Sequence, residues 1–234
     1  MLAFATHPAT AFRHPAQPID CRTSHLKTFD KMFSSQPARH LEPHQHLFHE
    51  GDDDRNIYRI EAGMVRLYRL LSDGRRQILS FRFAGDVLGF EATARRHCSA
   101  EAVTPVRLQS LDQFTTYRSL KDDPALAPQL VTLLAQELDN ARSQIAVLNR
   151  RSAIEKLAAF ILELHARQGN QGDIDLQLSR SDIADFLGLT IETVSRNLTK
   201  LRARRIIQLL TIHELVILDM PHLRNLAAGA CEDW

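Results

Sequence analysis

The sequence predicts an α+β protein in which an N-terminal antiparallel β-roll is followed by a long coiled-coil helix and a C-terminal winged helix-turn-helix. Three observations predict this order. Glycines recur at nearly equal intervals between residues 51 and 85, apolar residues repeat with a period of about 3.5 between 127 and 148, and two short helical patterns meet at Gly188.

The composition is that of an ordinary globular protein without a strong charge bias. Of the 234 residues, 44% are hydrophobic and 24% charged, and 29 Lys and Arg against 28 Asp and Glu give a formal net charge of +1. This balance excludes a polybasic tail protein or a strongly acidic chaperone, but not a local basic face. No apolar run approaches the roughly 18 residues that span a bilayer, and residues 1–14 lack the apolar core of a signal peptide. We therefore expect a cytoplasmic protein with no membrane contact.

The first half of the chain divides into two segments. Residues 1–35 contain three prolines and are expected to form a poorly ordered arm with one short helix from His25 to Phe33. Residues 36–123 are expected to form the β-roll, because short apolar runs alternate with glycines that permit tight turns. The runs are Leu47–Phe48, Ile57–Ile60, Met64–Leu71, Ile78–Phe83 and Val103–Leu108, and the glycines are Gly51, Gly63, Gly74, Gly85 and Gly89.

Residues 124–150 predict one long helix for dimerisation. Its apolar residues follow alternating steps of four and three, which is the pattern of a coiled-coil seam. This seam consists of Ala127, Val131, Leu134, Leu138, Ala141, Ile145 and Leu148. Unbroken heptads favour a homodimer, although a helix packed against its own β-roll also shows apolar residues at i, i+3 and i+4.

Residues 151–234 are expected to form the winged helix-turn-helix. A helix from Ala153 to Gln168 comes first, and residues 206–210 and 215–218 have the pattern of two wing strands. Between them, Ser179 begins a short helix that ends at Gly188, and Thr190 begins a second one that runs to Ala203. The second helix turns three apolar residues inward: Val194, Leu198 and Leu201.

The outward side of this second helix carries the residues that indicate a function. Glu192, Ser195 and Arg196 stand at i, i+3 and i+4, so they share one patch near the helix N-terminus. That end of a recognition helix reaches base edges in the major groove of DNA. Arg196 can bind guanine through two hydrogen bonds, Glu192 can accept one from cytosine N4, and Ser195 suits several bases. The alternative is a solvated helix with an incidental Glu–Arg pair.

Further polar residues of this region are candidates for contact with the DNA backbone. They are Ser179, Arg180, Thr190, Thr193, Lys200, Arg202, Arg204 and Arg205. The chain from 179 to 207 has a surplus of basic over acidic residues, although the whole chain is nearly neutral. Double-stranded DNA is therefore the partner that we expect.

On these residues the sequence resembles the CRP/FNR family of bacterial transcription regulators over nearly the whole chain. The segment from Ile183 to Arg196 matches the helix-turn-helix of the family, and the five glycines match its β-roll. Residues 188–196, Gly-Leu-Thr-Ile-Glu-Thr-Val-Ser-Arg, are similar to the FNR and FixK branch, whose Glu, Ser and Arg read a TTGA-containing half-site.

The resemblance implies a transcription regulator, expected to be an activator and not an enzyme. It also implies a cyclic-nucleotide-binding-like jelly roll, a homodimer on a two-fold symmetric TTGA-N6-TCAA operator, and contact with RNA polymerase through a surface loop around residues 72–76. The wing departs from the family pattern, since Arg204 and Arg205 stand where many relatives have an acidic residue and a glycine.

A second departure concerns ligands of the β-roll. Cys98–Ser99 stands where the family has the Arg-Ser pair that holds a cyclic phosphate, so cyclic AMP is not expected. The N-terminal cysteines of FNR are reduced to Cys21, so no iron–sulfur cluster is expected either. This combination resembles the FixK type, which has no cofactor.

Two rival hypotheses remain. Cys98 is a redox candidate if it is exposed and if Arg95, Arg96 and His97 lower the pKa of its thiol, whereas an inert thiol is the simpler interpretation. The β-roll could also hold a small-molecule ligand, because the sequence does not distinguish a lined pocket from a filled core. A remote third is a cupin-like metal enzyme, from the spacing of His44, His46 and Glu50, but we expect no metal.

Overall fold

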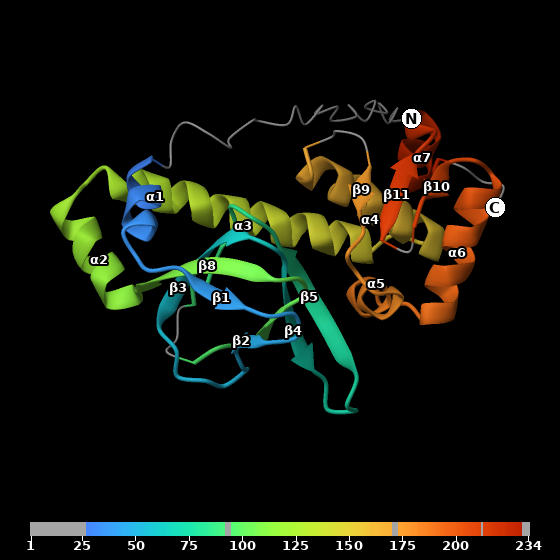
Figure 1. Ribbon diagram of the computed structural model, residues 1–234. Helices are drawn as coiled ribbons and strands as arrows, with labels where there is room; N and C mark the ends of the chain where they lie inside the picture. Colours follow the sequence, from blue (N-terminus) through green and yellow to red (C-terminus); the bar gives the residue numbers. More distant parts are fainter. Residues whose placement is uncertain (1–26, 92–94, 170–172, 212, 231–234) are drawn as a thin grey trace, which may run out of the picture.

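The computed structural model describes residues 27–91, 95–169, 173–211 and 213–230, and it confirms the predicted α+β fold class (Figure 1). An antiparallel β-roll lies under a long helix, and a second domain of helices with a small sheet lies at one end of that helix. Among the described helices, none combines the length and the hydropathy that crossing a membrane requires.

The β-roll consists of two four-stranded antiparallel sheets. In spatial order, the first contains β1 (Arg39–Leu41), β8 (Val106–Asp112), β3 (Asn56–Ala62) and β6 (Val87–Leu88), and the second contains β2 (His46–Phe48), β7 (Ser99–Ala102), β4 (Val65–Leu70) and β5 (Arg76–Arg82). Alternating apolar residues such as Ile60, Val65 and Leu108 are fully buried between the sheets. The sequence analysis identified β2, β3, β4, β5 and β8, but missed β1, β6 and β7.

The last part of the predicted N-terminal arm, 1–35, contains the expected short helix, and this helix packs into the fold. α1 (Lys27–Ser34) packs between the β-roll and the long helix, and it buries Phe29 and Phe33 almost completely. The rings of these two residues also meet edge to face. Residues 1–26 lie outside the described residues. The β-roll segment also ends in a helix that was not predicted, α2 (Gln113–Asp122), whose first turn is capped by Asp112.

α3 (Leu126–Leu148) is the long helix expected from the heptad pattern. Its inner face buries Leu126, Leu133 and Val147 against the rest of the chain. The predicted seam lies on the other face. α4 (Ala153–Arg167) follows after four residues and begins at Ser152, whose side chain accepts a hydrogen bond from the backbone N–H of Glu155.

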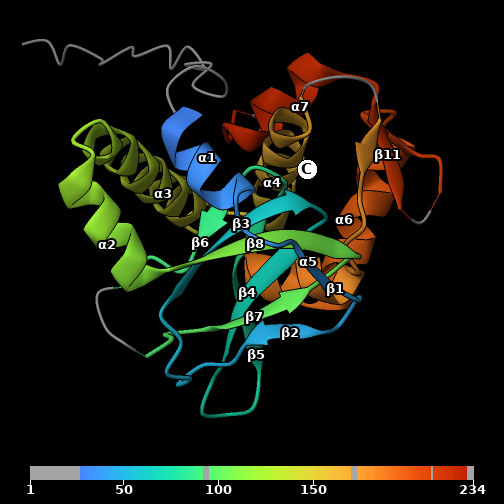
Figure 2. The ribbon, with the colours of Figure 1, turned by 60° about the vertical axis from the view of Figure 1, so that its left-hand side comes forward.

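The C-terminal domain contains the two predicted short helices, α5 (Arg180–Leu187) and α6 (Ile191–Ala203). A three-stranded sheet lies beside them, with β11 (Glu214–Ile217) between β10 (Ile207–Leu209) and β9 (Ile174–Asp175). The wing prediction identified β10 and β11, but missed β9 and the last helix, α7 (Met220–Ala227). Helices α4 and α7 pack together, and α4 also contacts α6 (Figure 2).

The C-terminal domain shares a hydrophobic core with the β-roll. Ile78 and Phe81 of β5 belong to the same buried cluster as the residues of α4 and α5. The ring of Phe81 lies 6.4 Å from that of Phe160 and 5.2 Å from that of Phe186. The two domains of one chain are therefore docked against each other through β5.

Candidate nucleic-acid interface

The helix-turn-helix is built by three local signals in the sequence. Ser179 and Asp182 form a reciprocal capping box at the start of α5. Gly188 ends α5 in the left-handed conformation, with φ of 64°, and this reverses the chain toward α6. Thr190 caps α6, because its side chain accepts a hydrogen bond from the N–H of Thr193 at 3.2 Å.

The turn places the predicted base-reading residues on the surface. Val194, Leu198 and Leu201 are buried against the domain core, as the helical period requires. Glu192, Ser195 and Arg196 are all exposed, within the first two turns of α6. The structure therefore brings these three side chains to one outward patch.

Glu192 is held as a carboxylate by the start of its own helix. Its pKa lies below the ordinary value, mainly because its own backbone N–H donates to it, with further contributions from the Thr190 side chain and the charge of Arg196. Among the described residues, no ion pair closer than 4 Å joins Glu192 to Arg196. The incidental pair that the sequence left open is thus not formed.

The candidates for backbone contact fall into two groups. Those on or beside α6 that are exposed are Thr190, Lys200, Arg202, Arg204 and Arg205, and Thr193 is half-buried. The other two serve α5 instead. The hydroxyl of Ser179 both donates to Asp182 and accepts from its N–H. Burial lowers the pKa of Arg180, and its Nη1 is shielded from solvent.

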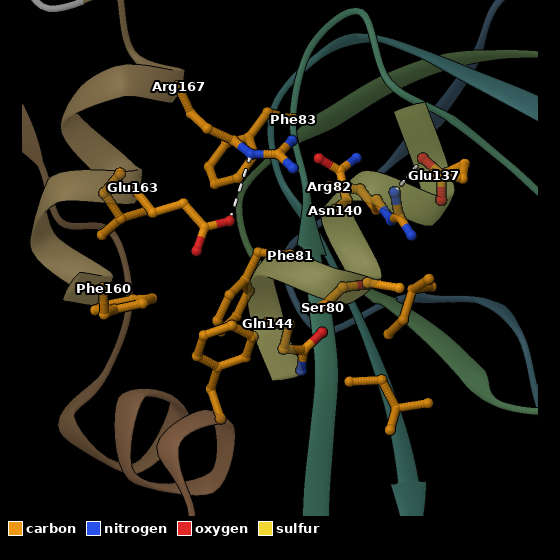
Figure 3. A pocket seen from close by; sticks show the side chains of 15 residues that line it. Ser80, Phe81, Arg82, Phe83, Glu137, Asn140, Gln144, Phe160, Glu163 and Arg167 are labelled. Carbon is orange, nitrogen blue, oxygen red and sulfur yellow. Dashed lines mark hydrogen bonds and ion pairs between the residues drawn. The ribbon is translucent and has the colours of Figure 1, made fainter. Parts of the chain in front are cut away.

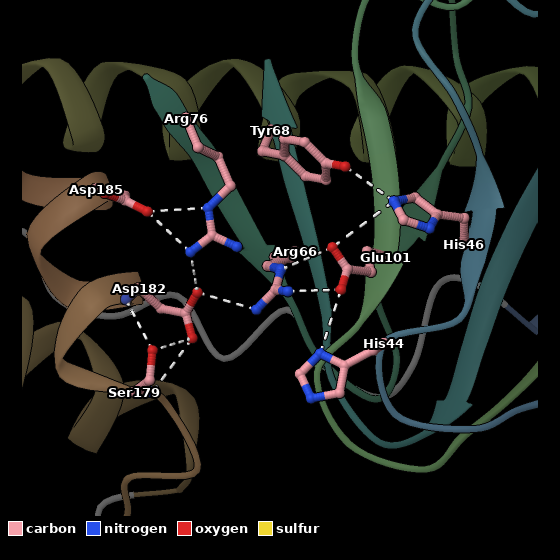
Figure 4. Close-up of polar contacts among 9 residues, drawn as sticks. All are labelled: His44, His46, Arg66, Tyr68, Arg76, Glu101, Ser179, Asp182 and Asp185. Atoms are coloured by element: carbon pink, nitrogen blue, oxygen red, sulfur yellow. Dashed lines mark hydrogen bonds and ion pairs between the residues drawn. The ribbon is translucent and has the colours of Figure 1, made fainter. Parts of the chain in front are cut away.

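A buried ion network joins α5 to the β-roll (Figure 4). Arg66 of β4 donates to Glu101 of β7 at 2.6 and 3.2 Å and to Asp182 of α5 at 2.9 Å. Arg76 of β5 donates to the same Asp182 at 2.7 Å and to Asp185 at 2.9 Å. Sequence reasoning missed this network, because Arg66 and Arg76 lie more than a hundred positions from their partners in α5.

The residues of the cupin-like hypothesis have other partners in this fold. His44 lies 3.3 Å from Glu101, His46 lies 2.8 Å from the hydroxyl of Tyr68, and Glu50 pairs with Arg69. In the described part of the chain, no three His, Cys, Asp or Glu side chains are grouped as a metal site would need.

Cys98 lacks the two properties that a redox site requires. The side chain is buried in the β-roll, and burial raises the pKa of its thiol to about 11. The neighbouring Arg96 does not activate it. Its guanidinium is itself buried, donates to Asp54 at 2.8 Å and lies over the ring of Phe48. This arginine is thus already neutralised and is not a free partner for an anion.

The predicted coiled-coil seam is exposed to solvent in the single chain. Val131, Leu134, Leu138 and Ile145 are between 44% and 66% exposed. Ala127 and Ala141 are exposed too, and Leu148 is half-buried. A row of large apolar side chains along one helix is costly to leave in water.

A cavity of about 270 Å³ lies where β5, α3, α4 and α5 meet (Figure 3). Phe81, Phe160 and Phe186 form an aromatic wall of this cavity. Arg82 and Arg167 lie at its polar edge, where Arg82 pairs with Glu137 at 2.5 Å. Burial raises the pKa of Glu163, which also lines the cavity. The Nε of Arg82 is buried and has no hydrogen-bond partner among the described residues.

The comparisons with known proteins agree with this arrangement of domains. The cyclic nucleotide-binding domain family matches residues 38–122, and the Crp-like helix-turn-helix domain family matches residues 155–226. The nitrogen fixation regulation protein FixK of Rhizobium meliloti (strain 1021) is 39% identical over 184 residues, which is 79% of this chain and 84% of that protein. FixK of Bradyrhizobium diazoefficiens is 40% identical over 195 residues, which is 81% of each.

The chain belongs to the CRP/FNR family and is of the FixK type.

The solved structure of FixK2 from Bradyrhizobium japonicum is similar to this FixK-type chain, with a TM-score of 0.78 and 33% sequence identity. The similarity covers 84% of this chain and 99% of that one. The FixK-type protein is a transcription regulator with a helix-turn-helix DNA-binding domain. The relatives are regulators, so the prediction that the chain is not an enzyme is confirmed as well.

Native Cys98 should react slowly with maleimide. In a Cys21→Ser, Cys231→Ser variant, where Cys98 is the remaining cysteine, labelling at pH 7.5 should be about a hundredfold slower in the native state than in guanidinium, because the buried thiol forms less thiolate. The native rate should keep rising toward pH 11, while the unfolded rate levels off near pH 9. Equal rates at pH 7.5 would restore the redox hypothesis.

Proposed function

We propose that the protein binds double-stranded DNA as a homodimer, at an inverted repeat of the TTGA-N6-TCAA type, and activates transcription. The observation that carries this proposal is the outward patch of Glu192, Ser195 and Arg196 at the start of α6. Two TTGA half-sites separated by six base pairs have centres about 10 base pairs apart, one turn of DNA. A two-fold dimer would present both copies of α6 to one side of the duplex.

Each residue of the patch has a chemical role in this proposal. Arg196 donates two hydrogen bonds to O6 and N7 of guanine. Glu192 accepts from an amino group of cytosine, which suits a carboxylate that stays ionised at neutral pH. Ser195 can donate or accept, so it adapts to the base beside them.

The electrostatics around α6 favour a polyanion. Lys200 and Arg202 are exposed in the last turn of the helix, and Arg204 and Arg205 are exposed directly after it. Two acidic residues of the same region, Asp182 and Asp185, are neutralised from behind by the arginines of the β-roll. The positive charge facing a duplex is therefore larger than the sequence count alone indicates.

The exposed seam of α3 supports the homodimer. Pairing two copies along this seam would remove the exposed apolar row from water, and heptad spacing keeps it facing a partner helix. For RNA polymerase contact we propose the turn between β4 and β5, residues 72–75. Arg76, the last residue of the predicted loop, is instead bound to α5 of its own chain.

Loss of the Arg196 side chain should relax base preference. Arg196→Ala should weaken operator binding by about 1–3 kcal/mol at each half-site, because one bidentate guanine contact is lost. It should also reduce the penalty for replacing that guanine, as measured by fluorescence anisotropy with matched duplexes. Arg118→Ala, an exposed arginine of α2, serves as the control. Equal weakening on operator and random DNA would make Arg196 a phosphate contact.

A charge in the seam should prevent dimerisation. Leu138→Arg should weaken self-association by about a hundredfold or more in sedimentation equilibrium, because two guanidinium groups would be buried without partners. Leu218→Arg is a matched control, since Leu218 and Leu138 are each 51% exposed and Leu218 lies outside α3. A Leu138→Arg protein that stays folded and dimeric shows that the seam is misassigned.

The cavity beside β5 favours a second candidate function, a regulator gated by a small molecule. Its aromatic wall suits an apolar body, and the unpartnered Nε of Arg82 suits a carbonyl acceptor. The arginines at the edge are already paired with carboxylates, so an uncharged ligand fits better than an anion. The volume of this cavity, about 270 Å³, is close to about 300 Å³, the lower end of the range for small-molecule pockets.

Acetophenone is a suitable probe of the cavity, with ethylbenzene as the analogue that lacks the acceptor. Arg82→Lys keeps the positive charge beside Glu137 but removes the Nε donor, so it should weaken acetophenone binding about fivefold in ligand-observed NMR. Ethylbenzene binding should not change. Arg107→Lys, at an exposed pair with Glu61, is the control. Equal acetophenone binding in both variants would exclude the role of Arg82.

A further inference from the structure

Arg66 is the more deeply buried of two β-roll arginines that reach the helix-turn-helix, and Arg76 is the other. Its side chain is only 7% exposed, and its guanidinium lies between Glu101 and Asp182, whose side chains are 9% and 5% exposed (Figure 4). Glu101 belongs to the same sheet as Arg66, whereas Asp182 lies 116 positions away in α5. The charges on both sides fix the guanidinium plane, because bonds between a guanidinium and carboxylates are strongly directional.

The carboxylate that Arg66 binds is also part of the start of α5. Oδ1 of Asp182 accepts from Arg66 and Arg76, and Oδ2 accepts from the backbone N–H and the hydroxyl of Ser179. Arg76 also binds Asp185, one turn further along the helix. The β-roll therefore holds α5 at two successive turns, through bonds of 2.7 to 2.9 Å.

The position of α5 determines that of α6. The two helices pack against each other across the turn at Gly188 and share the buried stripe of Ile183, Leu187, Val194 and Leu198. The same β-roll is also tied to α3 by the pair of Arg82 with Glu137 and by the buried Leu133. The β-roll is thus a rigid bridge between the exposed seam and the base-reading patch.

The covalent connection between α3 and α4 restricts the orientation of the C-terminal domain less than these contacts do. Only four residues, 149–152, join α3 to α4, and they are not helical. Rotation there would swing the whole C-terminal domain. Apolar contacts such as Phe81 with Phe186 hold the domain close but are not directional. The ion pairs of Arg66 and Arg76 are directional, so they fix the orientation of the C-terminal domain.

We propose that Arg66 is a positioning residue that sets the spacing between half-sites that the dimer accepts. It acts through Asp182, by fixing the angle of α6 relative to α3 and hence to the second copy of α6. The inference rests on the proposed function, a dimer on an inverted repeat. Adding or removing one base pair of spacer rotates one half-site by about 35° and shifts it by about 3.4 Å, which a rigid dimer does not follow.

The test measures binding to TTGA and TCAA half-sites whose spacer is six base pairs, or one shorter or longer. The variant is Arg66→Met with Glu101→Gln, so that Glu101 is not left as a buried, unpaired carboxylate, while Asp182 keeps Arg76. The unaltered protein should prefer the six-base-pair spacer by about tenfold or more, and the variant by less than about threefold. Arg107→Met, which removes an exposed arginine of β8, should keep the full preference.

Three results separate the hypotheses. If the unaltered protein binds no inverted repeat better than random DNA, the proposed function fails. If it prefers six base pairs and the folded double variant keeps the same ratio, the role of Arg66 is refuted, even where all affinities fall together, since uniform loss is what a merely structural residue produces. If the double variant does not fold, the spacer preference of Arg66→Lys is measured instead. Its single ammonium keeps the charge but not the fork that binds both carboxylates, so a reduced preference supports the role of Arg66 and an unchanged one refutes it.

Discussion

The DNA-binding domain meets the β-roll at a buried ion network centred on the guanidinium of Arg66, which lies between a carboxylate of its own sheet and a carboxylate of α5. Charges are expensive to bury, and such a site persists only when every partner is present in good geometry. Here both carboxylates have further polar neighbours: His44 lies 3.3 Å from Glu101, while Arg76 and Ser179 donate to Asp182. The network therefore has polar partners on both sides of the boundary between the two domains.

Residues whose structural signal is local could be predicted from the sequence. The caps at Ser179 and Thr190 and the glycine at 188 specify the helix-turn-helix within a few positions, so the outward patch of α6 followed directly. The heptad pattern of α3 is also local, and its apolar row is where it was predicted. By contrast, β6 and β9 have two residues each, too few for an alternating pattern to show.

What the sequence did not predict depends on distant residues. The burial of Cys98 follows from packing beside β7 in the roll, and without it the sequence left an activated thiol open beside the simpler, inert one. Arg96 is a second example. The sequence shows only a basic residue, whereas in the fold its guanidinium is buried and bonded to Asp54, 42 positions earlier. In both cases the sequence shows the type of side chain, but the surroundings of that side chain depend on which strands pair across the roll.

The proposed base-reading patch and the chain just after α6 each keep a feature that stability alone would not favour. Glu192 and Arg196 have the spacing and order that normally form a helical ion pair, yet the helix start holds the carboxylate instead, so the guanidinium points to solvent. Arg205 has a left-handed backbone, with φ of 56°. That conformation costs a non-glycine residue about 1–2 kcal/mol. Both departures leave an exposed cation beside α6, which is what contact with a nucleic acid requires and what folding of the chain by itself does not.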